Sequence, residues 1–282
     1  MEPNEIMERS REVICAQWHE LLRLRKEVLK TSDIEAIHDL RVASRGFRAA
    51  VGLFEPWIPS KSAALLKKRA KKLTRRLGGL RNIDEAILFF RLHTPTGSGG
   101  GYQICRILSE SRPVELARIK KGLKAFDVRQ LNRKVRKATA GLKEGRGTDN
   151  SGVTLPAYFS DSSIRLFQPI HDLLPLAISR EQRVSRHLLR IAIKKWRYFI
   201  EIVAPVLGFD AGSILGLLKE YQTVLGRMND VAVFAGLCGN LDLSRHERRF
   251  VEATLQTEEE LLLQKLVELI EQKPLVYTFP LA

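Results

Sequence analysis

Residues 38–48 read His38-Asp-Leu-Arg41-Val-Ala-Ser-Arg45-Gly-Phe-Arg48, and residues 187–197 read His187-Leu-Leu-Arg190-Ile-Ala-Ile-Lys194-Lys-Trp-Arg197. A histidine and three cations recur in the same order, 149 positions apart. Because an α-helix turns about 100° per residue, these four residues lie on one face of each helix. Apolar side chains take the opposite face. The pattern predicts two amphipathic helices, each with a cationic stripe.

Further matches indicate an internal duplication. Leu77-Gly78 corresponds to Leu225-Gly226 at nearly the same separation, and Pro56 corresponds to Pro205, just past each predicted helix. A repeat of this length is too long for a solenoid and fits a duplicated half-domain of about four helices. We therefore predict a single domain over 1–282, with an N-terminal half 1–140, a linker 141–152 and a C-terminal half 153–282.

The whole sequence favours an all-α fold of two duplicated halves with about four helices each. Helix-forming residues are abundant, and the alternation typical of strands is scarce. The helices are expected at roughly 3–30, 33–54, 60–92, 102–111, 113–140, 154–179, 181–203, 211–239 and 242–272, with ends uncertain by a few residues. Two glycine-rich stretches, 94–101 and 141–152, are expected to be loops, and Pro113 is expected in a first helical turn.

Positive charge is concentrated in the first half of the chain. The formal net charge is +15. Residues 1–150 hold 32 basic and 17 acidic residues, whereas residues 151–282 hold 15 of each. A concentrated positive field indicates a polyanionic partner such as nucleic acid, polyphosphate or an anionic membrane surface.

Two features suggest that these cations face a ligand. Residues 67–76 hold seven Lys or Arg with no acid between them, although like charges at helical spacing repel each other. Residues 38–54 and 187–203 contain only Asp39 and Glu201 as acids, and apolar residues border the stripe of the second helix. Cations in such a position are unfavourable without an anion. We expect basic helices that face a groove or a pore.

The repeated His-x-x-Arg-Val/Ile-x-x-Arg/Lys-x-x-Arg helix, followed in each copy by a Leu-Gly segment with Asn or Asp, resembles the CHAD family, the so-called histidine α-helical domain. The resemblance covers nearly the whole chain. It implies an all-α fold of two four-helix-bundle halves related by pseudo-twofold symmetry. It also implies that basic helices from both halves line a central cavity that binds inorganic polyphosphate. It also implies a cytoplasmic protein that associates with polyphosphate granules.

The resemblance assigns polyphosphate-binding roles to cations and histidines of both halves. They are His38, Arg41, Arg45, Arg48, Lys68, Lys71, Lys72, Arg75, His187, Arg190, Lys194, Arg197 and Lys219. The chain departs from the family pattern at two places. Gly46 stands where a second Arg is usual, and the first half reads Arg81-Asn82-Ile83-Asp84 where an Arg-Asp-x-Asp string is usual.

Polyphosphate has no base edges, so its recognition must be electrostatic and geometric. Arg forks onto two oxygens, and Lys supplies a mobile point charge. Phosphate or sulfate ions are expected to mimic the ligand. We expect no cofactor, no metal and no catalytic residue, because the sequence has no Gly-rich phosphate loop and no paired-cysteine zinc motif. The three separated cysteines, Cys15, Cys105 and Cys238, fit a reducing cytosol.

Two other functions stay open. A metal-dependent phosphohydrolase of the HD type would use His19, His38-Asp39 and Asp84, but the second copy has Leu188 in place of Asp39. A non-specific nucleic-acid-binding protein would also be basic, but the basic stretches lack a series of stacking aromatics. Membrane binding is not expected, because no helix opposes a Trp/Phe face to a Lys-rich face.

Overall fold

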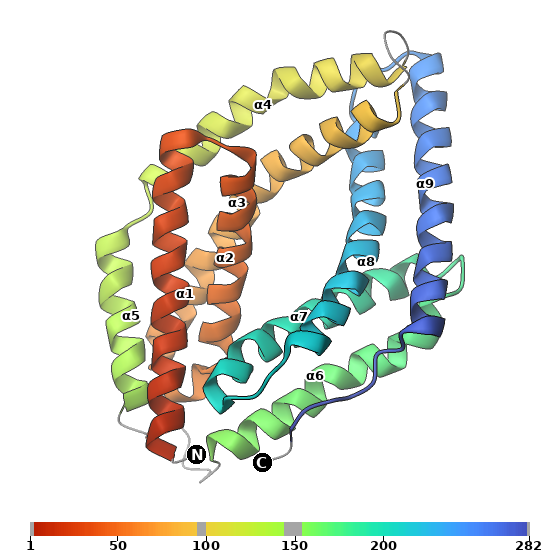
Figure 1. The fold of residues 1–282 in the computed structure, drawn as a ribbon. Helices are drawn as coiled ribbons and strands as arrows, with labels where there is room; N and C mark the ends of the chain where they lie inside the picture. The colour runs from red at the N-terminus through yellow and green to blue at the C-terminus, as the bar shows by residue number, and fades with distance from the viewer. Residues whose placement is uncertain (1–2, 95–99, 144–153, 281–282) are drawn as a thin grey trace.

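The computed structural model describes residues 3–94, 100–143 and 154–280, and the regular structure there is entirely helical (Figure 1). The long helices are α1 (Pro3–Thr31), α2 (Ile34–Leu53), α3 (Ser60–Leu92), α4 (Gly100–Lys124), α5 (Val128–Lys143), α6 (Leu155–Ala177), α7 (Arg183–Leu207), α8 (Gly212–Gly239) and α9 (Arg245–Gln272). A short 3-10 helix, η1 (Glu55–Trp57), follows α2. The predicted all-α fold is confirmed.

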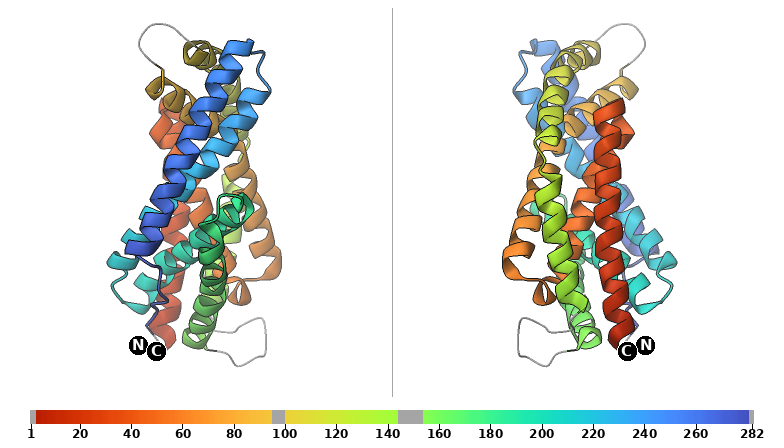
Figure 2. Two further views of the ribbon diagram at one scale, coloured as in Figure 1. Left: turned by 90° about the vertical axis from the view of Figure 1, so that its right-hand side faces the viewer. Right: turned by 90° about the vertical axis from the view of Figure 1, so that its left-hand side faces the viewer.

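The helices pack in pairs around the molecule. In Figure 1, α1 and α2 lie on the left with α5 outside them, and α3 and α4 run together across the top. The pair α8 and α9 descends on the right, and α6 and α7 lie along the bottom. In the views of Figure 2, the two ends of the chain lie close together. This arrangement places α2 beside α7 and α3 beside α8.

Two hydrophobic cores hold the helices, and each takes residues from both predicted halves. The larger core joins α1, α2, α3 and α5 to α6, α7 and α8, with Phe47, Phe54, Phe159 and Trp196 fully buried. The smaller core joins the end of α3 and the start of α4 to α8 and α9. The described helices of the first half are therefore packed against those of the second. The duplication and its boundaries stay predictions.

Local signals fix several helix ends. The Asp33 side chain accepts a hydrogen bond from the backbone N–H of Ala36 and caps α2. Ser244 and Glu247 form a capping box at the start of α9. Gly208 ends α7 with a φ of 72°, a left-handed conformation that a residue with a Cβ adopts at a cost.

The expected start of a helix at Pro113 is wrong. Helix α4 continues through Pro113 to Lys124, and the interruption falls instead after it, where Asp127 accepts from the backbone N–H of Gln130 at the start of α5. A proline inside a helix costs about 3 kcal/mol. Burial of Leu108 before it and Ile119 after it offsets this cost.

The expected end of a helix before Pro205 is also wrong. Helix α7 includes Pro205 and ends at Leu207. Pro205 is exposed, whereas Ala204 and Val206 on either side are buried. Packing of the final turn therefore keeps the helix going until Gly208 ends it.

The two expected loops are described only in part. Of the stretch 94–101, Gly100 and Gly101 belong to α4, and 95–99 lie outside the described residues. Of the predicted linker 141–152, the first three residues belong to α5, and the rest lie outside the described residues.

Candidate anion-binding site

Helices α2 and α7 bring the two predicted stripes together. Arg41 and Arg45 of α2 lie near Arg190 and Lys194 of α7, close enough for the charge of Arg45 to contribute to the lowered pKa values of Arg41, Arg190 and Lys194. Arg81 of α3 lies beside them. We call Arg41, Arg45, Arg81, Arg190 and Lys194 the central cluster. It joins cations that the sequence separates by about 150 positions.

Two carboxylates pair with Arg81, one of these cations, and Glu85 of its own helix lies 3.5 Å from its Nε. Asp230 of α8 accepts two hydrogen bonds from the guanidinium of Arg81, at 2.5 and 2.7 Å. This bidentate geometry is the strong form of an Arg–carboxylate pair. The hydrogen bonds and charge of Asp230 outweigh burial and raise the pKa of Arg81. The pair also ties α3 to α8, across the two predicted halves, and leaves the other four cations of the central cluster without a bonded carboxylate among the described residues.

The pKa values report this lack of counter-charge. Burial, together with the charges of Arg190, Arg45 and Arg41, lowers the pKa of Lys194 to about 6. Burial and neighbouring arginines likewise lower the pKa of Arg41 to about 10. Burial is also the main cause that lowers the pKa of Arg190. Both effects disfavour the charged form, and a bound anion would reverse the electrostatic part.

Three guanidinium groups also have unused hydrogen-bond donors. The Nε atoms of Arg41, Arg45 and Arg190 are buried and have no hydrogen-bond partner within the described part of the chain. A buried donor without a partner costs about 1–3 kcal/mol. An oxygen-rich anion in the cluster would satisfy these donors.

Close packing of α2 against its neighbours positions the first stripe. Ser44 is buried, and its hydroxyl lies 2.7 Å from the hydroxyl of Thr74 on α3. Gly46 is buried against α1, where an added Cβ would come within 2.7 Å of the Gln17 side chain. An arginine at 46 would therefore require Gln17 to move.

The other stripe residues are placed less centrally. His38 and Arg48 are half-buried on α2, and the described residues offer neither of them an ion-pair partner. Arg197 differs from the expectation of a free cation, because it donates to Glu201 and to Gln222, both at 2.7 Å. An i,i+4 pair of this kind reduces the positive charge that Arg197 offers a ligand.

The remaining predicted residues lie on the surface. Lys68, Lys71, Lys72 and Arg75 are exposed on one side of α3, and within the described ranges none of them forms an ion pair. Lys219 is exposed on α8. His187 is exposed and lines a separate cavity between α7, α8 and α9. The structure therefore brings four of the thirteen predicted residues into the central cluster and arranges the others around it or away from it.

The acids of the two halves play different parts. Asp84 of the first half is buried and accepts from Arg112 of α4 at 2.7 Å, so it joins α3 to α4. Asp230 of the second half faces the cluster instead. The first half, which has Asn82 in place of the usual Asp, thus uses its remaining acid, Asp84, to hold α3 against α4.

The residues of the alternative metal site are not assembled. Asp84 is bonded to Arg112, and Asp39 is exposed. Over residues 3–94, 100–143 and 154–280, no group of three or more His, Cys, Asp or Glu side chains could hold a metal ion.

Sequence reasoning missed two members of the site and one further basic surface. Arg81 and Asp230 were noted as motif residues but not as site residues, because their meeting depends on how α3 packs against α8. Helix α5 contains no acid, and its exposed cations follow helical spacing. They are Arg129, Arg133, Arg136 and Lys137, and that spacing was the available signal.

Comparison with known proteins places the chain in a family. Residues 12–239 match the CHAD domain. A crystal structure of the CHAD domain from the plant Ricinus communis superposes with a TM-score of 0.68 at 19% identity, covering 94% of this chain and 90% of that one.

A second solved structure has the same fold. PptA from Streptomyces chartreusis gives a TM-score of 0.67 at 14% identity, over 94% of this chain and 98% of its own. No curated protein sequence matches. Among the described helices, none is long and apolar enough to cross a membrane. Because the family match covers most of its length, this chain belongs to the CHAD domain family.

Proposed function

We propose that this protein binds inorganic polyphosphate without catalysing a reaction on it, and that it acts in the cytoplasm at polyphosphate granules. The observation that carries the proposal is the central cluster. Four arginines and Lys194, from α2, α3 and α7, lie near Asp230, which Arg81 already binds. A bound polyanion would favour the charged form of Lys194. The cluster therefore favours a ligand with several negative charges and many acceptor oxygens.

A chain of phosphates suits this geometry better than a single anion. The cations of the two stripes extend along α2 and α7. Helix α3, which carries Arg81, also carries exposed cations in the turns before it. A polyanion can contact several of them at once, which a single phosphate cannot. The half-buried positions of Arg41 and Arg190 also fit a slender chain better than a wide DNA duplex. The bases of a single strand would find no stacking aromatics in the cluster.

The test is a binding titration of the full chain with long-chain polyphosphate. Affinity should fall steeply between about 50 and 200 mM salt, because binding releases counterions. The variant Arg41→Gln with Arg190→Gln should weaken binding by about tenfold or more, since each charge-assisted hydrogen bond contributes about 1.5–3 kcal/mol.

A matched control separates the site from the overall charge. Arg129→Gln with Arg133→Gln removes two charges from the exposed face of α5 and should change affinity much less. Equal losses in the two double variants would contradict the proposed site. Displacement of polyphosphate by duplex DNA at equal phosphate concentration would favour the nucleic-acid alternative.

A further inference from the structure

A cavity of about 610 Å³ lies between the start of α7, α8 and α9. Its volume is within the range of small-molecule sites, about 300–1,000 Å³. The floor is apolar and is formed by side chains of α8, α9 and the segment between them, including Met228, Val231, Cys238, Leu243, Val251 and Leu255. Asn229 borders this cavity, whereas the next residue, Asp230, faces the central cluster. The cavity is thus distinct from the cluster.

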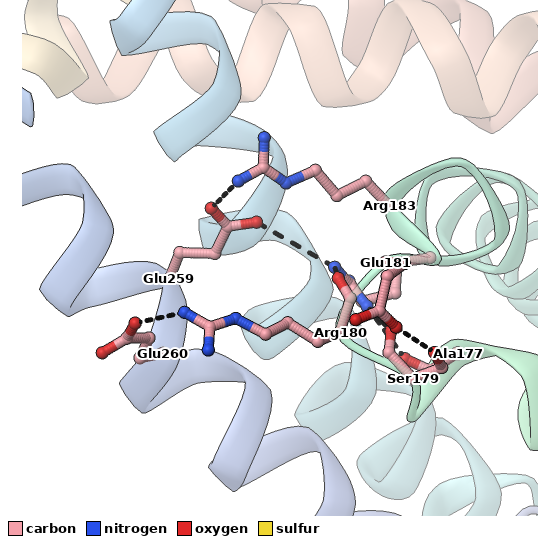
Figure 3. Close-up of polar contacts among 8 residues, drawn as sticks. Ala177, Ser179, Arg180, Glu181, Arg183, Glu259 and Glu260 are labelled. Carbon is pink, nitrogen blue, oxygen red and sulfur yellow. Dashed lines mark hydrogen bonds and ion pairs between the residues drawn. The ribbon is translucent and has the colours of Figure 1, made fainter.

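Charged residues stand along its rim. Arg180 and Arg183 reach across to α9, where they bind Glu260 at 2.6 Å and Glu259 at 2.5 Å (Figure 3). Beneath them, Arg186 is 4% exposed, and its guanidinium donates to the backbone carbonyls of Ala177, Ser179 and Arg180.

The buried charge of Arg186 is only loosely compensated. Its nearest carboxylate is Glu259, at 3.9 Å, which is already bound to Arg183. Glu260 is likewise shared between Arg180 and Gln256. The α7 side of the rim therefore keeps a net positive charge. The carboxylates of Glu259 and Glu260 opposite are already paired with arginines.

Arg183 is positioned to bind a further acceptor. One of its terminal nitrogens donates to Glu259, and the remaining donors of this exposed guanidinium are unused within the described residues. His187 follows one turn later on α7 and also lines the cavity, so the two side chains share a face. On the α9 side, Glu252 stands exposed and would repel an anion, and Arg248 already donates to the backbone carbonyls of Leu241 and Leu243. An anionic group is thus favoured at the α7 end.

We propose that this cavity binds a small amphipathic anion, whose apolar body contacts the floor from α8 and α9 and whose single anionic group lies at Arg183 and His187. The ligand needs a small apolar part that covers the apolar floor. A polyphosphate has no such part, and its oxygens would lack hydrogen-bond donors there. The proposal does not depend on polyphosphate binding at the central cluster.

Decanoate is a suitable probe for the full chain, with decyltrimethylammonium as a cation of the same chain length. Isothermal titration should show saturable binding of one decanoate per chain and much weaker binding of the cation. Arg183→Gln should weaken decanoate binding by about tenfold, because a charge-assisted hydrogen bond is lost. Arg183 is exposed, so its replacement is not expected to affect folding.

A second variant shifts affinity in the opposite direction. Glu259→Gln removes the carboxylate that competes for Arg183 and Arg186, so decanoate should bind several-fold more tightly. Arg129→Gln on α5 makes the same charge change as Arg183→Gln at a distant place and should leave binding unchanged. Equal binding of decanoate and the cation, an unchanged affinity in Arg183→Gln, or weaker binding in Glu259→Gln would each overturn the proposal.

Discussion

Lys194 shows how the environment of one residue sets its chemistry. Its side chain is half-buried on α7, and the charges facing it are Arg190 on its own helix, Arg41 and Arg45 on α2, and Asp230 on α8. Burial and the three arginines lower its pKa from 10.5 to about 6, and Asp230 offsets only part of this. At pH 7 the unfolded chain therefore binds a proton at this lysine that the folded chain largely lacks.

This shift predicts a pH dependence of stability. Between about pH 6 and pH 10.5 the unfolded state binds more protons at Lys194, so the free energy of unfolding should rise with pH across that window. Lys194→Met should flatten the rise. Urea unfolding at several pH values from 6 to 9 measures the effect. The control Lys195→Met changes the exposed neighbour and should keep the parental profile. If the free energy of unfolding depended on pH equally in the parent and in Lys194→Met, the pH dependence could not be assigned to Lys194.

At the scale of elements, two helices carry dense positive charge in different settings. Helix α3 presents Lys68, Lys71, Lys72 and Arg75 on the surface, and helical geometry puts Lys71 and Arg75 within about 120° of Arg81. Helix α5 packs its apolar side on α1 and α3 and points its cations outward. In Figure 1 it lies at the outer edge, beyond α1.

The position of these helices predicts unequal contributions to binding. Replacing Lys68, Lys71, Lys72 and Arg75 with Ala should weaken polyphosphate binding by about tenfold or more and make it less dependent on salt. The matched variant of α5 replaces Arg129, Arg133, Arg136 and Lys137 with Ala and should weaken binding far less. Both should stay helical, because Ala is the best helix former. Titrations at two salt concentrations, with circular dichroism, would test this. Equal losses would mean that net charge, and not position, controls affinity.

At the scale of the molecule, the two cores bind the predicted halves into one unit. The smaller core packs Phe90 of α3 and Ile104 of α4 against Phe234 of α8 and Leu262 of α9. The larger core packs α2 against α7. Since neither core belongs to one half, unfolding of either half would expose apolar surface of the other.

We therefore expect one cooperative unfolding transition. Tryptophan fluorescence reports the larger core, where Trp18, Trp57 and Trp196 lie, and circular dichroism reports all helices. Phe90→Ala in the smaller core should cost about 3–5 kcal/mol and shift the midpoints of both signals together. A shift in circular dichroism with an unchanged fluorescence midpoint would indicate that the two cores unfold independently.

The sequence by itself determined the helical fold and the composition of both stripes. Helical periodicity is a local property, so it identified Arg41 and Arg45 on one helix and Arg190 and Lys194 on another. It failed at Pro113 and Pro205, because burial on both sides of each proline outweighs the local cost.

Only the tertiary structure decided which cations are free and which are bonded. Arg197 donates to Gln222 of α8 in addition to its i,i+4 partner Glu201, and Arg81 donates to Asp230 of α8, although periodicity treats all arginines alike. The Arg81–Asp230 pair joins residues 149 positions apart, and it exists because α3 packs beside α8. Counter-charge and burial depend on distances between helices, and a one-dimensional pattern does not contain those distances.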